Sequence, residues 1–154
     1  MSKQSSGILM YRRKNDRLEF LLVHPGGPFW KKKDTGAWSI PKGEFDDEDA
    51  LQAAKREFEE EIGMPIEGQM VALEPQKQKG GKLVHAWALE GDLDPQNIKS
   101  NTFEMEWPPK SGKKQQFPEI DRAEWFPAPT ALQKINQAQA AFIRELIVKL
   151  DAQE

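Results

Sequence analysis

The chain has 154 residues and no cysteine, with 22 lysine and arginine side chains against 25 aspartate and glutamate side chains. This length fits one domain with a hydrophobic core and is too short for two ordinary ones, so we expect a single domain over residues 1–154. The lack of cysteine excludes disulfides and thiolate metal sites, and a formal charge of −3 favours neither nucleic acid nor a membrane as a partner.

No segment approaches the roughly 20 consecutive apolar residues that a membrane-spanning helix needs. Residues 1–16 also lack the long apolar stretch of a secretory signal. We therefore expect a cytoplasmic protein.

The first part of the chain predicts a β-hairpin and a loop. Two apolar runs, residues 6–13 and 18–23, flank the polar turn KNDR and are typical of paired strands. Residues 24–36, HPGGPFWKKKDTG, are rich in Gly, Pro and Lys, which predicts a loop. A short extended piece, AWSI at 37–40, follows and ends at Pro41.

Residues 50–62 predict a helix because most of them are good helix formers. Asp47 or Asp49 is suited to the N-cap position. Gly63, followed by Pro65, predicts the end of the helix.

The second half of the chain predicts more strands and a final helix. Strand candidates occupy residues 69–73, 82–89, 102–107 and 120–126, and the third and fourth are separated by the polar loop PPKSGKKQQ. In the third, an apolar face alternates with an acidic one, formed by Phe103, Met105 and Trp107 against Glu104 and Glu106. The stretch from about 130 to 150 predicts an amphipathic helix whose apolar stripe is Ile135, Ala138, Phe142, Ile143, Leu146 and Leu150. The sum is an α+β or layered α/β/α domain with a mixed sheet.

Glutamates fill four of the five positions from 57 to 61. At about 100° per residue, Glu57, Glu60 and Glu61 share one arc of roughly 100° on the predicted helix, whereas Glu59 points elsewhere. Carboxylates this close repel each other, so the arrangement calls for an explanation.

Two interpretations of this acidic face are open. A run of charges on a helix is usually a solvated surface. The neighbouring cations Lys55 and Arg56 are expected to point off the arc, which would leave the carboxylates without the ion pairs of an ordinary exposed face. Several carboxylates without cationic partners form an oxygen-ligand site for a hard divalent ion such as Mg²⁺.

From Glu48 the sequence continues with seven residues and then REFEEEIGM, residues 56–64. This segment resembles the box of the Nudix hydrolase family: a glycine, five residues, a glutamate, seven residues, then Arg-Glu-apolar-x-Glu-Glu-x-Gly-apolar. Every position from Glu48 onward matches. Gly43 stands one residue too close to Glu48, so the loop between them is shortened. The segment WSIPKGEF, the order of strands and the late helix also resemble the family.

The resemblance implies an α/β/α sandwich with a catalytic loop–helix–loop. It also implies hydrolysis of a phosphoanhydride in a nucleoside diphosphate linked to another group, with Mg²⁺, or Mn²⁺ in its place, as the cofactor and a nucleotide as the small-molecule substrate. By position, Glu57, Glu60 and Glu61 would bind the metal, and Glu48 would be an auxiliary carboxylate.

The resemblance assigns further roles around the helix. Arg56 would orient Glu57 or its neighbours through a salt bridge, and Gly43 and Gly63 would permit the turns at the two ends. Lys42, next to Gly43, is either a phosphate contact or a solvated lysine.

A general base must lie within hydrogen-bond reach of the attacking water. The candidates are one of the box glutamates or, outside the box, Glu104, Glu106 or Glu119. For each of these last three, an ordinary surface glutamate is the competing interpretation. Similarly, Lys31, Lys32 and Lys33 after Trp30 either hold an anionic tail beside a stacked base or form a solvated basic loop.

Three functions are considered. The first is a nucleotide pyrophosphohydrolase acting on diadenosine polyphosphates or nucleoside triphosphates, and WSIPKGE resembles the diadenosine polyphosphate branch more than the nucleotide-pool sanitising branch. The second is a catalytically silent Nudix domain that senses a nucleotide or docks a partner, and the third is a structural domain. The presence of all three box glutamates favours the enzyme. The sequence predicts no particular oligomeric state.

Overall fold

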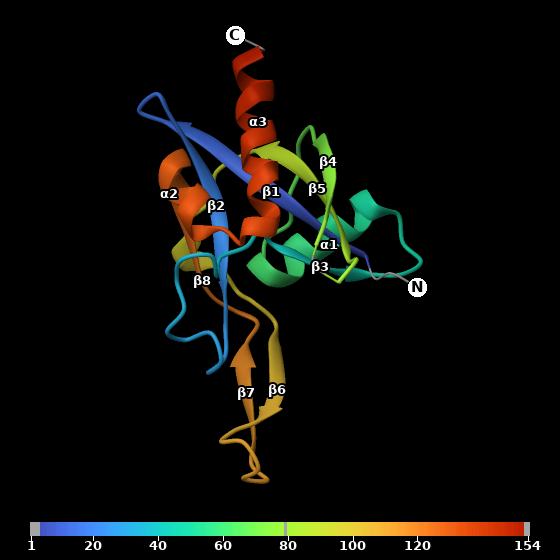
Figure 1. Ribbon diagram of the computed structural model, residues 1–154, viewed down its shortest axis with the longest axis vertical. Helices are drawn as coiled ribbons and strands as arrows, with labels where there is room; N and C mark the ends of the chain where they lie inside the picture. Colours follow the sequence, from blue (N-terminus) through green and yellow to red (C-terminus); the bar gives the residue numbers. More distant parts are fainter. Residues whose placement is uncertain (1–3, 79, 153–154) are drawn as a thin grey trace.

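The computed structural model describes residues 4–78 and 80–152, which form three layers (Figure 1). A mixed sheet lies in the middle, with α1 (Ala50–Ile62) against one face and the C-terminal helices against the other. The predicted α/β/α arrangement is confirmed. Among these residues no helix is long and apolar enough to cross a membrane.

The central sheet has the strand order β4-β5-β1-β2-β8, and β3 pairs with β1 beside β2. Its strands are β1 (Gln4–Lys14), β2 (Arg17–Pro25), β3 (Lys42–Phe45), β4 (Val71–Lys77), β5 (Leu83–Glu90) and β8 (Ile120–Pro127). β1 and β5 run parallel, and the other pairs are antiparallel. A second, two-stranded sheet consists of β6 (Thr102–Glu106) and β7 (Lys114–Pro118), and a short 3₁₀ turn, η1 (Pro95–Asn97), precedes it.

Alternate residues of β1 and β2 enter different halves of the core because neighbouring side chains on a strand point to opposite faces. Leu9 and Phe20 pack with the C-terminal helices, whereas Ile8 and Leu21 pack with α1. The sheet is therefore buried on both faces, and α1 is held firmly against it by Phe58, which is fully buried.

α1 has the bounds that its sequence predicts. The Asp49 side chain accepts a hydrogen bond from the Gln52 backbone at 3.2 Å and caps the N-terminus. Gly63 ends the helix at φ 83°, in the left-handed region that glycine adopts without strain, and its N–H donates to the Glu59 carbonyl. β3 ends at Phe45, so only residues 46–48 span the shortened loop before the cap.

The prediction of one C-terminal helix from 130 to 150 is wrong. The segment contains α2 (Ala128–Lys134), a 3₁₀ turn η2 (Gln137–Gln139) and α3 (Ala140–Ala152). Ile135 interrupts the helix in an extended conformation because its backbone pairs with Trp38. Of the predicted apolar stripe, Ala138 lies exposed on η2, whereas the other five members are buried.

The strands of the structure differ from the predicted ones at four places. AWSI forms only isolated bridges, through Trp38 and Ser39, and the residues after it form the unpredicted strand β3. β4 begins and ends later than the predicted 69–73. β7 occupies part of the predicted loop PPKSGKKQQ because its backbone pairs with β6, which does not require an apolar pattern.

Candidate active site

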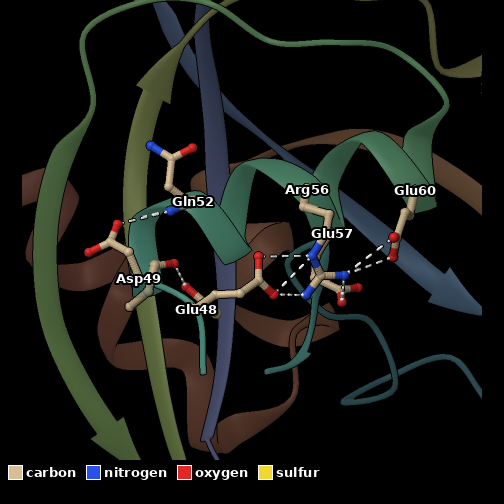
Figure 2. A network of polar contacts seen from close by, with 8 residues as sticks. Glu48, Asp49, Gln52, Arg56, Glu57 and Glu60 are labelled. Carbon is tan, nitrogen blue, oxygen red and sulfur yellow. Dashed lines mark hydrogen bonds and ion pairs between the residues drawn. The ribbon is translucent and has the colours of Figure 1, made fainter. Parts of the chain in front are cut away.

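Arg56 lies at the centre of the acidic face of α1 (Figure 2). Its guanidinium contacts Glu48 through Nε and Nη2, with Nε 3.0 Å from Glu48 Oε1. Nη1 lies 2.8 Å from Glu57 Oε1 and 3.3 Å from both carboxylate oxygens of Glu60. The expectation that Arg56 points off the arc is wrong, because its long side chain bends back across the helix surface to reach three carboxylates.

The charges of this network support one another. The Glu48 carboxylate makes the largest contribution to a pKa of Arg56 above its ordinary value, and Glu57 and Glu60 add to it. In return, the hydrogen bond from Arg56 lowers the pKa of Glu48. Glu48, at the helix entrance, is thereby tied to the middle of the acidic face.

Glu57 is enclosed between α1 and β3. A Cβ atom built on Gly43 would overlap the Glu57 carboxyl group, so the lack of a side chain at Gly43 makes room for that group. Burial raises the pKa of Glu57, although the ion pair with Arg56 opposes this effect. Gly43 thus serves the packing of a site residue.

Glu61 is the most buried carboxyl group of the acidic face, with 8% of the residue exposed. Burial, reinforced by the nearby charge of Glu57, raises the pKa of Glu61 to about 8. The charge of Lys42 and a hydrogen bond from its backbone act in the opposite direction. A carboxyl group with this pKa is mostly protonated at neutral pH in the metal-free protein.

Lys42 is half-buried on β3. Burial is the largest cause of a pKa below the ordinary lysine value, and the nearby charge of Lys82 adds to it. Glu61, Glu44 and Glu57 act in the opposite direction. β3 therefore places a lysine in the electrostatic environment of Glu57 and Glu61.

A cavity of about 270 Å³ opens beside Glu61. Its lining combines three charged side chains with apolar walls from β2 and from the segment before β3: Val23, Pro25, Ser39, Ile40, Lys42, Glu61, Glu119 and Ile120. The charge of Glu119 contributes to the raised pKa values of Glu57 and Glu61, which places all three carboxyl groups in one electrostatic environment.

Only one of the three general-base candidates outside the box lines this cavity. Glu119 is held between β7 and β8 by backbone hydrogen bonds of 2.8 Å to Gly26 and to Asn101. Glu104 and Glu106 lie on β6, where Glu104 is 3.8 Å from Lys114 in an exposed ion pair. Glu119 stands directly before the strand that pairs with the end of β2, and this place depends on tertiary pairing.

Sequence reasoning missed the apolar walls of the cavity. Val23 and Pro25 lie at the end of β2, and Ile120 begins β8. Ser39 and Ile40 belong to the extended piece before Pro41, where Ser39 bridges to Val23. Their shared role depends on the pairing of β2 with β8 and with Ser39, which no local pattern reports.

The carboxylates of the acidic face are chemically suited to bind a divalent cation. Within the described part of the chain, no three histidine, cysteine, aspartate or glutamate side chains are arranged to hold a metal ion. Nevertheless, Glu57 and Glu61 have raised pKa values from burial and mutual repulsion, and a cation would relieve both effects. Carboxylate oxygens are also the ligands that Mg²⁺ prefers. In this structure the cationic partner of Glu57 and Glu60 is Arg56.

A mixed sheet between helices, with an acidic loop–helix–loop beside a cavity, defines a domain of the Nudix hydrolase class. The sequence matches the NUDIX domain family over residues 1–146. The chain therefore belongs to the Nudix family.

Solved structures have the same fold. A Caenorhabditis elegans Ap4A hydrolase in a binary complex has a TM-score of 0.66 and 23% identity, covering 97% of this chain and 98% of that one. A mutT/nudix family protein from Listeria innocua has a TM-score of 0.65 and 18% identity, with 98% and 95% covered. The NUDIX domain of Shewanella oneidensis NrtR, complexed with ADP ribose, has a TM-score of 0.63 and 15% identity, with 97% and 89% covered. At these identities the likeness concerns the fold.

A curated protein also resembles part of the chain. An octanoyltransferase from Myxococcus xanthus is 34% identical over 101 residues, which are 65% of this chain. The matched region spans a quarter of the length of that protein.

Proposed function

We propose that this protein is a divalent-cation-dependent pyrophosphohydrolase that cleaves a phosphoanhydride in a nucleoside diphosphate linked to another group. The observation that supports this proposal is the cavity in which Lys42, Glu61 and Glu119 meet at the buried edge of the acidic helix. A phosphoanhydride carries negative charge that must be neutralised, and its hydrolysis needs a water activated beside the phosphorus. The cavity contains groups for both tasks.

Glu57, Glu60 and Glu61 would hold the cation, Mg²⁺ or Mn²⁺, with Glu48 as an auxiliary carboxylate. When bound, such an ion neutralises charge on phosphate oxygens and makes a bound water more acidic. Arg56 positions Glu57 and Glu60 through the ion pairs of 2.8 and 3.3 Å seen in the structure.

Lys42 binds an oxygen of the reacting diphosphate. Lys42 lines the cavity, and burial strengthens the attraction of an ammonium group to a phosphate. Gly43, the next residue, leaves the space that the Glu57 carboxyl group occupies.

Glu119 is the general base of the proposed reaction. Its carboxylate takes a proton from the attacking water while the new P–O bond forms. The bridging P–O bond breaks, and the leaving phosphate departs with the electron pair of that bond. Lys42 lines the same cavity as Glu119.

Dinucleoside polyphosphates and nucleoside triphosphates are the proposed substrates. One structural relative is an Ap4A hydrolase and another binds ADP ribose, and both compounds contain a nucleoside diphosphate linked to a further group. A cytoplasmic location, where these nucleotides are available, is part of the same proposal.

Product release from a panel of nucleotides tests the proposal. Diadenosine tetraphosphate, ATP, ADP ribose and NADH would be incubated with Mg²⁺, with Mn²⁺ and with EDTA. We expect cation-dependent release and a loss of at least about a hundredfold in kcat/KM for Glu60→Gln. Glu59→Gln is the matched control because Glu59 is exposed on another side of the same helix turn.

Two results would contradict the proposal. Equal losses in Glu60→Gln and Glu59→Gln would show that the acidic face does not hold the cation. Binding of a nucleotide without any release, in the presence of either cation, would instead indicate a silent domain that senses its ligand.

A further inference from the structure

The β6–β7 hairpin, residues 102–118, projects from the body of the protein (Figure 1). We call it the arm. Two-stranded sheets are marginally stable alone, so an arm needs a packing partner on its apolar face. Its register pairs Phe103 with Phe117 and Met105 with Gln115.

The arm begins and ends at the catalytic helix and the cavity. Asn101, directly before β6, donates a backbone hydrogen bond of 3.2 Å to the carbonyl of Glu60. Glu119, one residue after β7, lines the cavity and accepts a backbone hydrogen bond of 2.8 Å from Gly26. The base of the arm is therefore joined both to α1 and to a residue of the cavity lining.

One face of the arm is apolar and is only half-buried. Its members are Phe103, Met105, Trp107 and Phe117. The rings of Phe103 and Phe117 lie 6.0 Å apart. Within the described residues, these side chains belong to neither of the two core clusters of the domain. Burial in the core therefore does not account for this face.

A second apolar element lies beside the base of the arm. Gly27 is so close to the Phe103 ring that a Cβ there would lie 2.9 Å from it. Immediately after Gly27 and Pro28, Phe29 is 68% exposed and Trp30 is 37% exposed. We call residues 28–33 the aromatic loop. Large exposed aromatic rings gathered next to a site are typical of a binding surface.

A buried histidine contacts the end of the aromatic loop. His24, fully buried at the end of β2, lies 2.6 Å through Nε2 from the carbonyl of Lys33 and 2.8 Å through Nδ1 from Asp121. These contacts fix the far end of the loop to β2 and β8. The loop is thus anchored to the two strands that carry Val23, Pro25 and Ile120 of the cavity lining.

The charge of the two elements favours an anionic occupant. The aromatic loop carries Lys31, Lys32 and Lys33 in sequence, all exposed. The Lys33 ammonium lies 4.8 Å from the Phe29 ring centre and 5.0 Å from that of Trp30. The arm adds Lys110, Lys113 and Lys114 near its tip, against Glu104 and Glu106 on β6, and Lys114 lies 3.8 Å from Glu104. Aromatic faces next to ammonium groups suit a ring attached to a phosphate chain.

We propose that the arm and the aromatic loop form a second subsite, which holds the nucleoside at the far end of a dinucleoside polyphosphate. The proposal rests on the proposed hydrolase function and specifies its substrate class. The cavity of about 270 Å³ takes the reacting diphosphate, and the phosphate chain leaves it past Glu119. The lysines neutralise the chain, and Trp30 stacks on the second base. A nucleoside triphosphate has no group for this subsite.

The test compares two substrates in variants of Trp30. Trp30→Ala is expected to raise KM for diadenosine tetraphosphate by about 5- to 150-fold, the range for loss of one stacked base, while kcat changes less than about twofold. For ATP, KM changes less than about twofold. Trp30→Phe retains an aromatic face and restores most of the affinity. Val148→Ala is the control, because Val148 is an apolar side chain, 67% exposed, on α3.

Calorimetric titration of diadenosine tetraphosphate and ATP in EDTA gives a second readout that requires no turnover. The subsite predicts weaker binding of diadenosine tetraphosphate alone in Trp30→Ala. Equal effects on both nucleotides, or no effect on either, would overturn it. If the arm instead packs on a second copy of the chain, Trp30→Ala and Phe103→Ser lower the molecular mass measured by light scattering. The affinities for diadenosine tetraphosphate and ATP are then unchanged, which also overturns the subsite. Hydrolysis of neither nucleotide would reject the proposed function, and the titration would still decide the subsite.

Discussion

Replacement of Glu61 by Gln tests the electrostatics of the buried end of the acidic face. The pKa of this carboxyl group is about 8 in the folded protein against an ordinary value of 4.5. The folded state therefore binds more protons than the unfolded state between pH 4.5 and 8, so the free energy of unfolding falls as pH rises through this window. Glutamine has the same shape, cannot ionise, and retains an oxygen that accepts the Lys42 backbone hydrogen bond.

The magnitude follows from the width of that window. Each pH unit between the two pKa values contributes about 1.4 kcal/mol, which gives an upper bound of about 5 kcal/mol above pH 8. Relaxation of the site and entry of water reduce this value, so we expect Glu61→Gln to be more stable than the natural protein by about 3 kcal/mol at pH 9 in EDTA. At pH 4.5 the two proteins should agree to within about 1 kcal/mol, because both side chains are then neutral.

Urea denaturation at half-unit pH steps from 4.5 to 9, with EDTA present, measures the difference. Glu59→Gln is the control for the substitution itself, because Glu59 is an exposed glutamate on the same helix. A stability difference between Glu61→Gln and the natural protein that is independent of pH would refute the reasoning. A millimolar divalent cation should reverse the order at pH 9, since it stabilises the ionised carboxylate.

Three further substitutions test the packing around the site. Gly43→Ala places a methyl group where the Glu57 carboxyl group lies and should lower stability by about 1–3 kcal/mol, and an unchanged urea midpoint would show that Glu57 moves freely. Phe58→Ala empties a fully buried position of α1 and should lower the free energy of unfolding by about 3–5 kcal/mol in calorimetric melting. A decrease of less than about 1 kcal/mol would contradict this packing. Gln139→Leu removes the side-chain oxygen that lies 3.0 Å from the Ile40 nitrogen and accepts its hydrogen bond. Urea denaturation should show a free energy of unfolding lower by about 1–3 kcal/mol, and an unchanged value would show that another acceptor replaces Gln139.

The helix and its carboxylates could be predicted from the sequence because their determinants are local. Asp49 caps α1, Gly63 ends it, and the 3.6-residue repeat places the glutamates on one arc. The strands β1 and β2 were predicted for the same reason, since a short polar turn joins two apolar runs. Local signals of this kind act within a few residues and need no knowledge of the rest of the chain.

Elements that depend on pairing with a distant part of the chain could not be predicted from the local sequence. The C-terminal helix is broken because Ile135 pairs with Trp38, which lies almost a hundred residues earlier. β7 has a polar sequence and is a strand because β6 lies beside it. In both cases tertiary hydrogen bonds outweigh the weak local preference.

The sequence by itself determined the acidic helix, the glycines at its ends and the family to which the chain belongs. Only the tertiary structure decided which charged groups meet. It placed Arg56 among the carboxylates instead of beside them and brought Lys42 into the cavity wall. It also selected Glu119 over Glu104 as the carboxylate beside Glu61, because the pairing of β2 with β8 controls what approaches the end of α1. Burial, which raises the pKa of Glu61, is likewise a property of the packed chain and not of any segment.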